Sequence, residues 1–190
     1  MKKFILLVFC ALSVSFSAYT QFSGGLGINY GTQIDEIGIS GKGTYSLNNN
    51  IELSGNFTYF LPYKYFTTYT NNGYTIENTV TESIRTLNLD IHYNFRISDK
   101  LDVYPYLGAN TTQVKITLES EIKYNSNSDT KSDTKSDTKS DTKTVYEPGL
   151  NIGIGAGYKL SGSLKGFGEI KYVVSDYDQF NFTLGLLYLF

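Results

Sequence analysis

The sequence predicts an all-β fold, an eight-stranded antiparallel up-and-down transmembrane β-barrel. Three observations support this prediction. Large apolar residues recur at every second position in segments of about 9–11 residues, the length of a tilted membrane-spanning strand. The composition favours strands, with 17 tyrosines, 12 phenylalanines and 18 glycines against 3 prolines. The last segment, residues 180–190, alternates up to the terminal Phe190, which in water would leave an exposed apolar edge.

Residues 1–20 are expected to be a secretory signal peptide. Lys2 and Lys3 precede a short apolar run at residues 4–12, and small and polar residues follow it before the expected cleavage after Thr20. The run is shorter than the ~20 residues of a spanning helix. Cys10 is the only cysteine, and the bulky Phe9 before it argues against a lipid anchor, so the mature chain should contain no disulfide.

The mature chain, residues 21–190, is expected to be one barrel domain. Loss of the two signal lysines moves the formal charge from −2 to −4. A basic footprint for nucleic acid is therefore absent. Every expected strand has one apolar face, and a smaller or polar set of residues alternates with it. In chain order the strands are expected at residues 22–30, 37–47, 51–59, 86–95, 101–109, 150–159, 169–174 and 180–190.

The apolar faces justify these strands one by one. They consist, strand by strand, of Phe22, Leu26, Ile28 and Tyr30; Ile37, Ile39, Tyr45 and Leu47; Ile51, Leu53, Phe57 and Tyr59; Leu87, Leu89, Ile91, Tyr93 and Phe95; Leu101, Val103, Leu107 and Ala109; Leu150, Ile152, Ile154, Ala156 and Tyr158; Ile170, Tyr172 and Val174; and Phe180, Phe182, Leu184, Leu186 and Tyr188.

The fifth strand is the least regular. Its apolar residues are odd-numbered up to Ala109 and even-numbered from Val114 onward. Because a slip of one residue exchanges the two faces, we expect a β-bulge near residues 110–113. The strand should continue beyond the membrane as a hairpin arm. Pro105 is unfavourable in a fully paired strand because it has no N–H.

The connections alternate in length, which sets the orientation. Short turns are expected at residues 48–50, 96–100 and 161–165, and the other connections have about 5, 24, 34 and 5 residues. Outer-membrane barrels place short turns in the periplasm and longer loops outside. The third outer loop contains Ser-Asp-Thr-Lys repeated four times at residues 128–143, which we expect to be a disordered, solvated tip.

The second outer loop, residues 61–83, contains five aromatic residues. They are candidates for binding a partner or a glycan, but packing within the outer loops is the favoured interpretation. These aromatic residues are Tyr63, Tyr65, Phe66, Tyr69 and Tyr74.

The whole mature chain resembles the small eight-stranded outer-membrane β-barrel proteins of the OmpA/OmpX-like group. The most specific likeness is the C-terminal signal read by the barrel-assembly machinery, for which this chain has Thr183, Gly185, Tyr188 and Phe190. Residues 105–108 also look like a fifth-strand motif of such proteins. The resemblance implies location in the cell outer membrane, contact with its lipid and lipopolysaccharide, and assembly by that machinery.

Charged residues assigned to the lumen are expected to pair with one another and fill it, because buried charges persist only when paired. This expected polar network consists of Lys42, Glu52, Arg85, Asp90, His92, Glu169 and Lys171. His92 is the only histidine, and its expected place low in the barrel does not suit a base acting on lipid at the outer surface. No cofactor or metal site is expected.

Function is less determined than fold. The leading hypothesis is a non-enzymatic surface protein with a role in envelope structure or adhesion, whose second and third outer loops could bind an extracellular ligand. One alternative is a narrow pore or small-solute conduit. The other is a soluble lipocalin-like periplasmic carrier, which would have its apolar residues inside.

Overall fold

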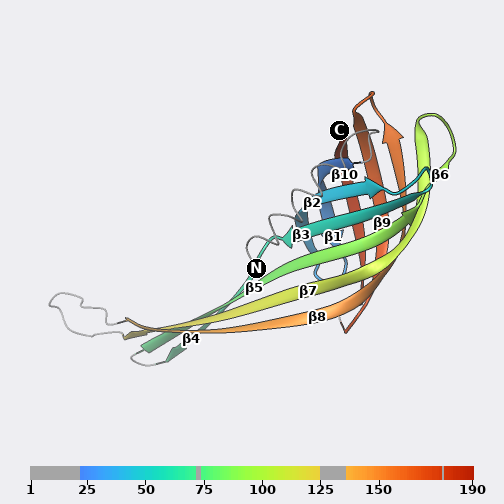
Figure 1. Ribbon diagram of the computed structural model, residues 1–190. Coiled ribbons are helices and arrows are strands. Elements are labelled where there is room, and N and C mark those ends of the chain that lie inside the picture. Colours follow the sequence, from blue (N-terminus) through green and yellow to red (C-terminus); the bar gives the residue numbers. More distant parts are fainter. Residues whose placement is uncertain (1–21, 72–73, 125–135, 177) are drawn as a thin grey trace, which may run out of the picture.

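The computed structural model describes residues 22–71, 74–124, 136–176 and 178–190. They form one antiparallel sheet, and β1 pairs with β10, so the sheet closes into a barrel of β1, β2, β3, β5, β7, β8, β9 and β10 (Figure 1). The strands are β1 (Phe22–Gly31), β2 (Glu36–Ser46), β3 (Ile51–Phe60), β4 (Tyr63–Asn71), β5 (Tyr74–Tyr93), β6 (Phe95–Arg96), β7 (Leu101–Tyr124), β8 (Ser136–Lys159), β9 (Leu164–Val174) and β10 (Gln179–Leu189). None of the described residues belongs to a helix long and apolar enough to cross a membrane.

The two faces of the barrel wall have the polarity of a membrane barrel. Leu26 and Leu184 point outward and are 69% and 73% exposed, whereas Asn88 and His92 point inward and are 2% and 1% exposed. The same alternation runs along the other barrel strands, as predicted. A lipocalin-like carrier would have the reverse arrangement, so this polarity argues against the carrier hypothesis.

One end of the barrel has tight turns fixed by side chains. Asn48 Oδ1 accepts hydrogen bonds of 2.9 Å from the backbone N–H groups of Asn50 and Ile51 between β2 and β3. Ser98 Oγ does the same for Lys100 and Leu101 between β6 and β7, at 3.3 and 3.1 Å. Such Asx-type turns satisfy the backbone donors of a short connection. This is the short-turn end.

Pro105 explains why β6 is separate from β5. The β5–β7 ladder runs without a shift from Tyr74↔Tyr124 to His92↔Tyr106, and Phe95↔Val103 resumes it in the same register. The interruption at residues 93–94 lies opposite Pro105, which has no N–H to donate. β6 is therefore the continuation of β5 beyond a missing ladder hydrogen bond.

The predicted bulge at residues 110–113 is wrong. Residues 101–123 of β7 pair with β8 in one unbroken register, and the pairing with β5 is equally regular. Val114 lies on the same inward face as Asn110 and Thr112, and all three are buried. The parity of the apolar residues changes because the interior itself becomes apolar at this level.

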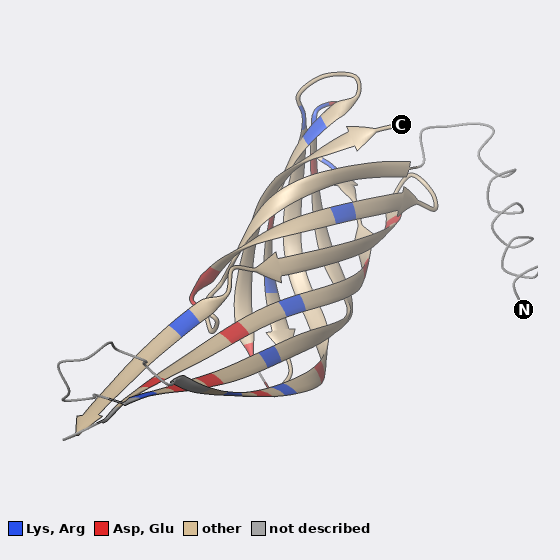
Figure 2. Ribbon diagram, turned by 90° about the vertical axis from the view of Figure 1, so that its left-hand side faces the viewer, with Lys and Arg blue, Asp and Glu red and all other residues tan. Residues whose placement is uncertain are grey.

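That apolar layer ends the polar lumen. Phe60, Ile84 and Val114 form a buried cluster, and Ile34 and Ile116 pack against it. Beyond it four strands leave the barrel together as a projecting sheet, which consists of β4 with residues 74–83, 115–124 and 136–144 of β5, β7 and β8 (Figures 1 and 2). We call this sheet the arm. It confirms the predicted hairpin extension of the fifth strand.

The arm replaces two segments that the sequence interpretation treated as loops. Residues 63–71 and 74–83 form a paired hairpin rather than an irregular second loop. Residues 136–143, the second half of the repeat, belong to β8, which corrects the expectation of disorder there, whereas residues 128–135 lie outside the described residues. A four-residue repeat is two strand periods, so Ser and Thr share one face and Asp and Lys the other.

Surface ion pairs also hold the arm. Lys123 Nζ lies 2.6 Å from Glu77 Oε2 on the neighbouring strand and 3.6 Å from Glu121 Oε2. The hydrogen bond to Glu77 and the charge of Glu121 raise the pKa of Lys123.

Candidate functional site

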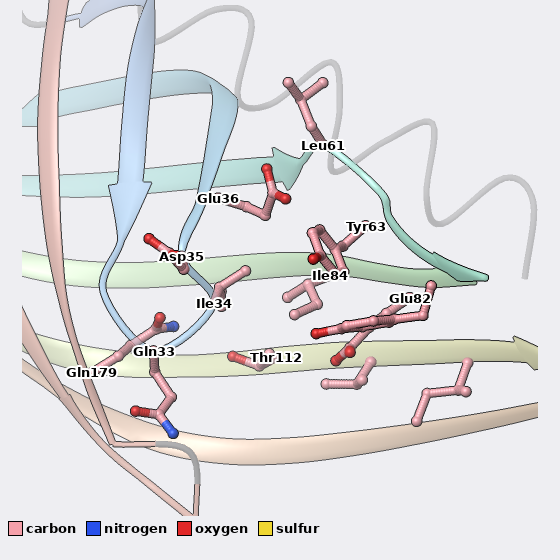
Figure 3. Close-up of a pocket in the computed structure, with 13 residues that line it drawn as sticks. Gln33, Ile34, Asp35, Glu36, Leu61, Tyr63, Glu82, Ile84, Thr112 and Gln179 are labelled. Atoms are coloured by element: carbon pink, nitrogen blue, oxygen red, sulfur yellow. The ribbon is translucent and has the colours of Figure 1, made fainter. Parts of the chain in front are cut away.

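A cavity of about 430 Å³ lies at the end of the barrel from which the arm projects (Figure 3). The turn between β1 and β2 forms one side of it, and the roots of β4, β5 and β7 form the other. Apolar side chains of the buried cluster, including Ile84 and Val114, line it together with Tyr63 and Tyr65. Sequence reasoning missed this cavity because its lining residues come from five separate segments of the chain.

Between the apolar cluster and the short-turn end, the lumen contains six of the seven predicted network residues. Lys42, Asp90 and His92 are at most 5% exposed. The Glu52 and Glu169 side chains are 14% and 10% exposed. Lys171 lies on the same inward face of β9 as Glu169 and reaches Asn88 across the lumen.

Arg85 is the exception, and its assignment to the lumen is wrong. It is exposed on the outer face of β5, on the same side as Leu87 and Leu89. Its guanidinium lies 5.5 Å from the ring centre of Tyr59 on β3. The parity of the strand already indicated this, because every odd residue of β5 from 85 to 91 points outward.

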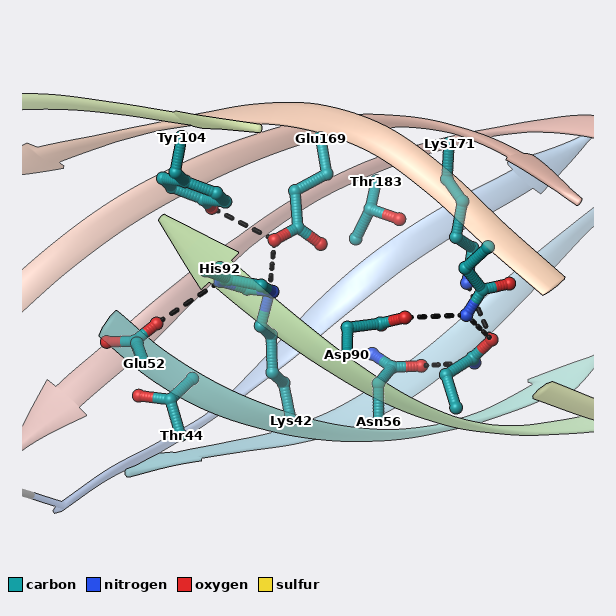
Figure 4. Close-up of polar contacts among 12 residues, drawn as sticks. Lys42, Thr44, Glu52, Asn56, Asp90, His92, Tyr104, Glu169, Lys171 and Thr183 are labelled. Atoms are coloured by element: carbon teal, nitrogen blue, oxygen red, sulfur yellow. Dashed lines mark hydrogen bonds and ion pairs between the residues drawn. The ribbon is translucent and has the colours of Figure 1, made fainter. Parts of the chain in front are cut away.

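One cluster of the network joins five strands, β2, β3, β5, β7 and β9, near the short-turn end (Figure 4). Lys42 on β2 pairs with Glu169 on β9, and the hydroxyl of Tyr104 donates a 2.9 Å hydrogen bond to Glu169 Oε1. His92 Nδ1 lies 3.3 Å from Glu52 Oε1, and its ring stacks on Tyr104 at 4.7 Å. Each carboxylate therefore faces a basic group, as buried charges require.

A second cluster lies further toward the arm. Lys171 Nζ donates a 2.7 Å hydrogen bond to Asn88 Oδ1, and Asn151 Nδ2 donates a 2.7 Å hydrogen bond to Asp90 Oδ1. Asn151 also reaches Asn88 at 3.1 Å. Amides thus bridge the acid Asp90 and the base Lys171, which do not form a direct ion pair. Sequence reasoning named the two charges but not Asn88 and Asn151 between them.

A third contact was also missed. Lys165 on β9 lies 3.2 Å from Asp102 on β7, and both side chains are largely buried. Each residue sits at the start of its strand, beside a turn, where the sequence alone gives no reason to place it inside. In β7 both Asp102 and the inward Tyr104 are even-numbered, and in β9 both Lys165 and the inward Glu169 are odd-numbered. This alternation already indicated that Asp102 and Lys165 point inward.

Glycines leave room for the large rings of the lumen. A Cβ added to Gly155 would lie 2.4 Å from the ring of Tyr104, and one added to Gly153 would lie 2.4 Å from Tyr106. Each glycine is the direct cross-strand partner of the tyrosine that covers it. The glycine-rich inner face of β8 therefore provides the space that these two aromatic rings occupy.

Three residues of the expected assembly signal, Thr183, Gly185 and Tyr188, lie in β10, and Phe190 directly follows it. Thr183 is buried and donates a hydrogen bond to Asn29, and Gly185 is covered by the ring of Phe167. Tyr188 and Phe190 point outward, with ring centres 5.1 Å apart. The ring of Phe190 also stacks on that of Phe22 across the closing seam, at 5.5 Å.

The chemistry of the lumen is that of a packed polar core. His92 is enclosed by Tyr104 and Tyr106, so a substrate outside the barrel could reach it only by displacing these rings. Within the described residues, no three His, Cys, Asp or Glu side chains come together as a metal site.

Comparison with known proteins agrees with this architecture. A major outer membrane protein from Thermus thermophilus has a TM-score of 0.57 at 15% identity, covering 90% of this chain and 99% of that one. Ail, the attachment invasion locus protein of Yersinia pestis, was solved with the heparin analogue sucrose octasulfate. It has a TM-score of 0.51 at 16% identity, covering 90% and 97%. At these identities the likeness concerns the fold. A search of curated protein sequences gave no match.

The family model described as the outer membrane protein beta-barrel domain matches residues 4–190, nearly the whole chain. Together with the closed ring, its apolar outer face and its polar lumen, this match places the protein in the outer membrane. The chain belongs to the outer membrane protein β-barrel domain family.

Proposed function

We propose that this protein is a non-enzymatic surface protein, in which a filled barrel anchors an arm that contacts partners outside the cell. The observation that carries the proposal is the arm itself. The longer connections of outer-membrane barrels lie on the external side. Here the strands that lead into one of them, β7 and β8, each have 24 residues, far more than a membrane span needs.

The arm has the surface of a contact element. Its register places one set of apolar and aromatic side chains on the same face as the inward residues Ile84 and Val114. Tyr63, Tyr65 and Leu118 on this face are 44–54% exposed. Exposed apolar patches of this kind mark contact surfaces. The apolar and aromatic side chains described on this face are Tyr63, Tyr65, Tyr69, Ile76, Val80, Ile116, Leu118 and Ile122.

The barrel would serve this function as an anchor. Its outer face contacts membrane lipid, and the end nearest the arm is expected to meet lipopolysaccharide. The C-terminal residues would be read by the barrel-assembly machinery during insertion. Ail is an attachment invasion locus protein, and its shared fold supports an adhesive role for a barrel of this architecture.

Surface labelling tests the orientation on which the proposal depends. In a background with Cys10→Ser, a cysteine at the exposed arm position Ser140 should react with a membrane-impermeant maleimide on intact cells. A matched cysteine at Gly162, exposed in a short turn, should react only after the outer membrane is opened. The reverse pattern would place the arm in the periplasm and refute the proposed function.

Conductance separates the anchor from a pore. Lys42–Glu169 and the Asn88–Asn151–Asp90 contacts cross the lumen, and the Phe60 cluster lies above them. We therefore expect the purified protein to pass no steady current in planar lipid bilayers. Stable ohmic steps that persist at neutral pH would favour the pore hypothesis instead.

A further inference from the structure

We propose that the cavity at the root of the arm is a binding site for a small organic cation, an ammonium group on a short apolar stem. The site deepens the proposed function by naming a ligand class for the outward end of the barrel. The cavity, of about 430 Å³, has the size of a small-molecule site.

The charge of the cavity has one sign. Asp35, Glu36 and Glu82 line it, and none of the other described residues that line it is a lysine or an arginine. Asp35 and Glu36 belong to the β1–β2 turn and the start of β2, whereas Glu82 lies on β5 (Figure 3). Acids from opposite walls therefore face a shared space without a protein cation there. Elsewhere in the barrel, acids such as Glu169 and Asp102 have a lysine partner.

Asp35 is held in its place. The hydroxyl of Tyr30 donates a 2.5 Å hydrogen bond to Asp35 Oδ1, and the backbone N–H of Asp35 donates to the carbonyl of Gly31 at 2.8 Å. Asp35 has a φ of 54°, the left-handed conformation that aspartate tolerates better than most residues. The turn thus fixes one carboxylate at the cavity.

A second, independent observation is an unsatisfied acceptor. Gln179 lines the cavity and is 3% exposed, yet its Oε1 has no hydrogen-bond partner among the described residues. In Figure 3 the side chain extends from β10 toward the turn that contains Gln33 and Asp35. A buried amide oxygen without a donor is costly. An N–H-rich ligand would satisfy it.

Most of the remaining lining residues are apolar or aromatic and suit the apolar stem of the ligand. Ile84, Val114 and Ile116 give an apolar floor, and Tyr63 and Tyr65 stand beside it with ring centres 4.3 Å apart. Partial removal from water and the adjacent Tyr63 raise the pKa of Tyr65, and the carboxylates of Glu82 and Glu36 act in the same direction. Tyrosine rings attract cations through their faces. Anionic ligands, by contrast, would meet three carboxylates.

The test uses the full barrel in nanodiscs of zwitterionic lipid, with n-hexylammonium as the probe and with 1-hexanol and hexyl sulfate as neutral and anionic controls that have the same alkyl chain. We expect saturable binding of n-hexylammonium alone, with shifts of the Gln179 side-chain amide resonances in NMR spectra. Affinity should fall as salt rises, because charge attraction is screened. Empty nanodiscs measure partition into lipid.

Matched variants locate the site. Glu36→Gln and Glu82→Gln should each weaken binding about threefold and together about tenfold, and Glu119→Gln on the exposed arm should leave it unchanged. A short lysine-containing peptide, added in place of n-hexylammonium, shows whether the site also binds a basic side chain. Binding of the amine or of the peptide supports an ammonium site.

Equal binding of hexanol, or wild-type affinity in the double variant, would overturn the cation site. These measurements use purified protein and do not depend on which side of the membrane the arm occupies. A failure here therefore differs from a failure of the surface-labelling experiment.

Discussion

Replacing Glu169 by lysine is expected to destabilise the barrel by about 3–5 kcal/mol, because it removes the partner of a buried charge and adds another of the same sign. Lys42 would then face a second ammonium group with its side chain only 2% exposed. Tyr104 would lose the acceptor of its 2.9 Å hydrogen bond. Refolding into lipid vesicles, followed by the heat-modifiable shift on gels and by circular dichroism in denaturant, measures the loss.

Two variants control this prediction. Glu119→Lys makes the same charge change at an exposed arm position and should cost little. The exchange Lys42→Glu with Glu169→Lys restores opposite charges and should recover part of the lost stability, although Tyr104 no longer meets a carboxylate. Equal stability of Glu169→Lys and the wild type would mean that the network does not hold the barrel together.

The barrel was predictable because its physical requirements repeat along the chain. Each spanning strand must show lipid an apolar face, so Leu87, Leu89 and Ile91 alternate with Asn88 and Asp90 wherever the chain crosses the membrane. The short turns were equally readable, because Asn48 and Ser98 are turn formers that satisfy the backbone N–H groups beside them.

The errors arose where the strands leave the membrane. Val114 looked like a change of face, but the face is constant and the interior changes from polar to apolar. The repeat looked disordered because it buries nothing, yet residues 136–143 gain a full set of ladder partners from β7. Strand pairing is a non-local interaction, and local composition does not report it.

Most of the charged residues of the lumen network could be predicted from the sequence, but the contacts between them could not. Lys42, Glu169 and Asp90 followed from parity, whereas their partners depend on the stagger of the strands around the barrel. Asp90 and Lys171 proved to be joined through Asn88 and Asn151 rather than directly. The cavity required the β1–β2 turn to lie beside the arm, which only closure of the ring brings about.

Gly155→Val is expected to destabilise the barrel strongly although it leaves every charge in place. The new Cβ would lie 2.4 Å from the ring of Tyr104, a residue that is only 3% exposed. Overpacking alone costs about 1–3 kcal/mol. Displacing the ring also breaks its hydrogen bond to Glu169 and its 4.7 Å stack on His92, so we expect a loss near or above the top of that range.

Gly55→Val is the matched control. Gly55 lies in β3, points outward, and has no atom within 4 Å of an added Cβ. Valine is also the better strand former, so this variant should be neutral or slightly stabilising in the same unfolding experiment. Adding Tyr104→Leu to Gly155→Val should recover part of the stability, because the smaller side chain makes room for the valine. If the two valines cost the same, the loss comes from the backbone of a strand glycine and not from the space that Gly155 provides for Tyr104.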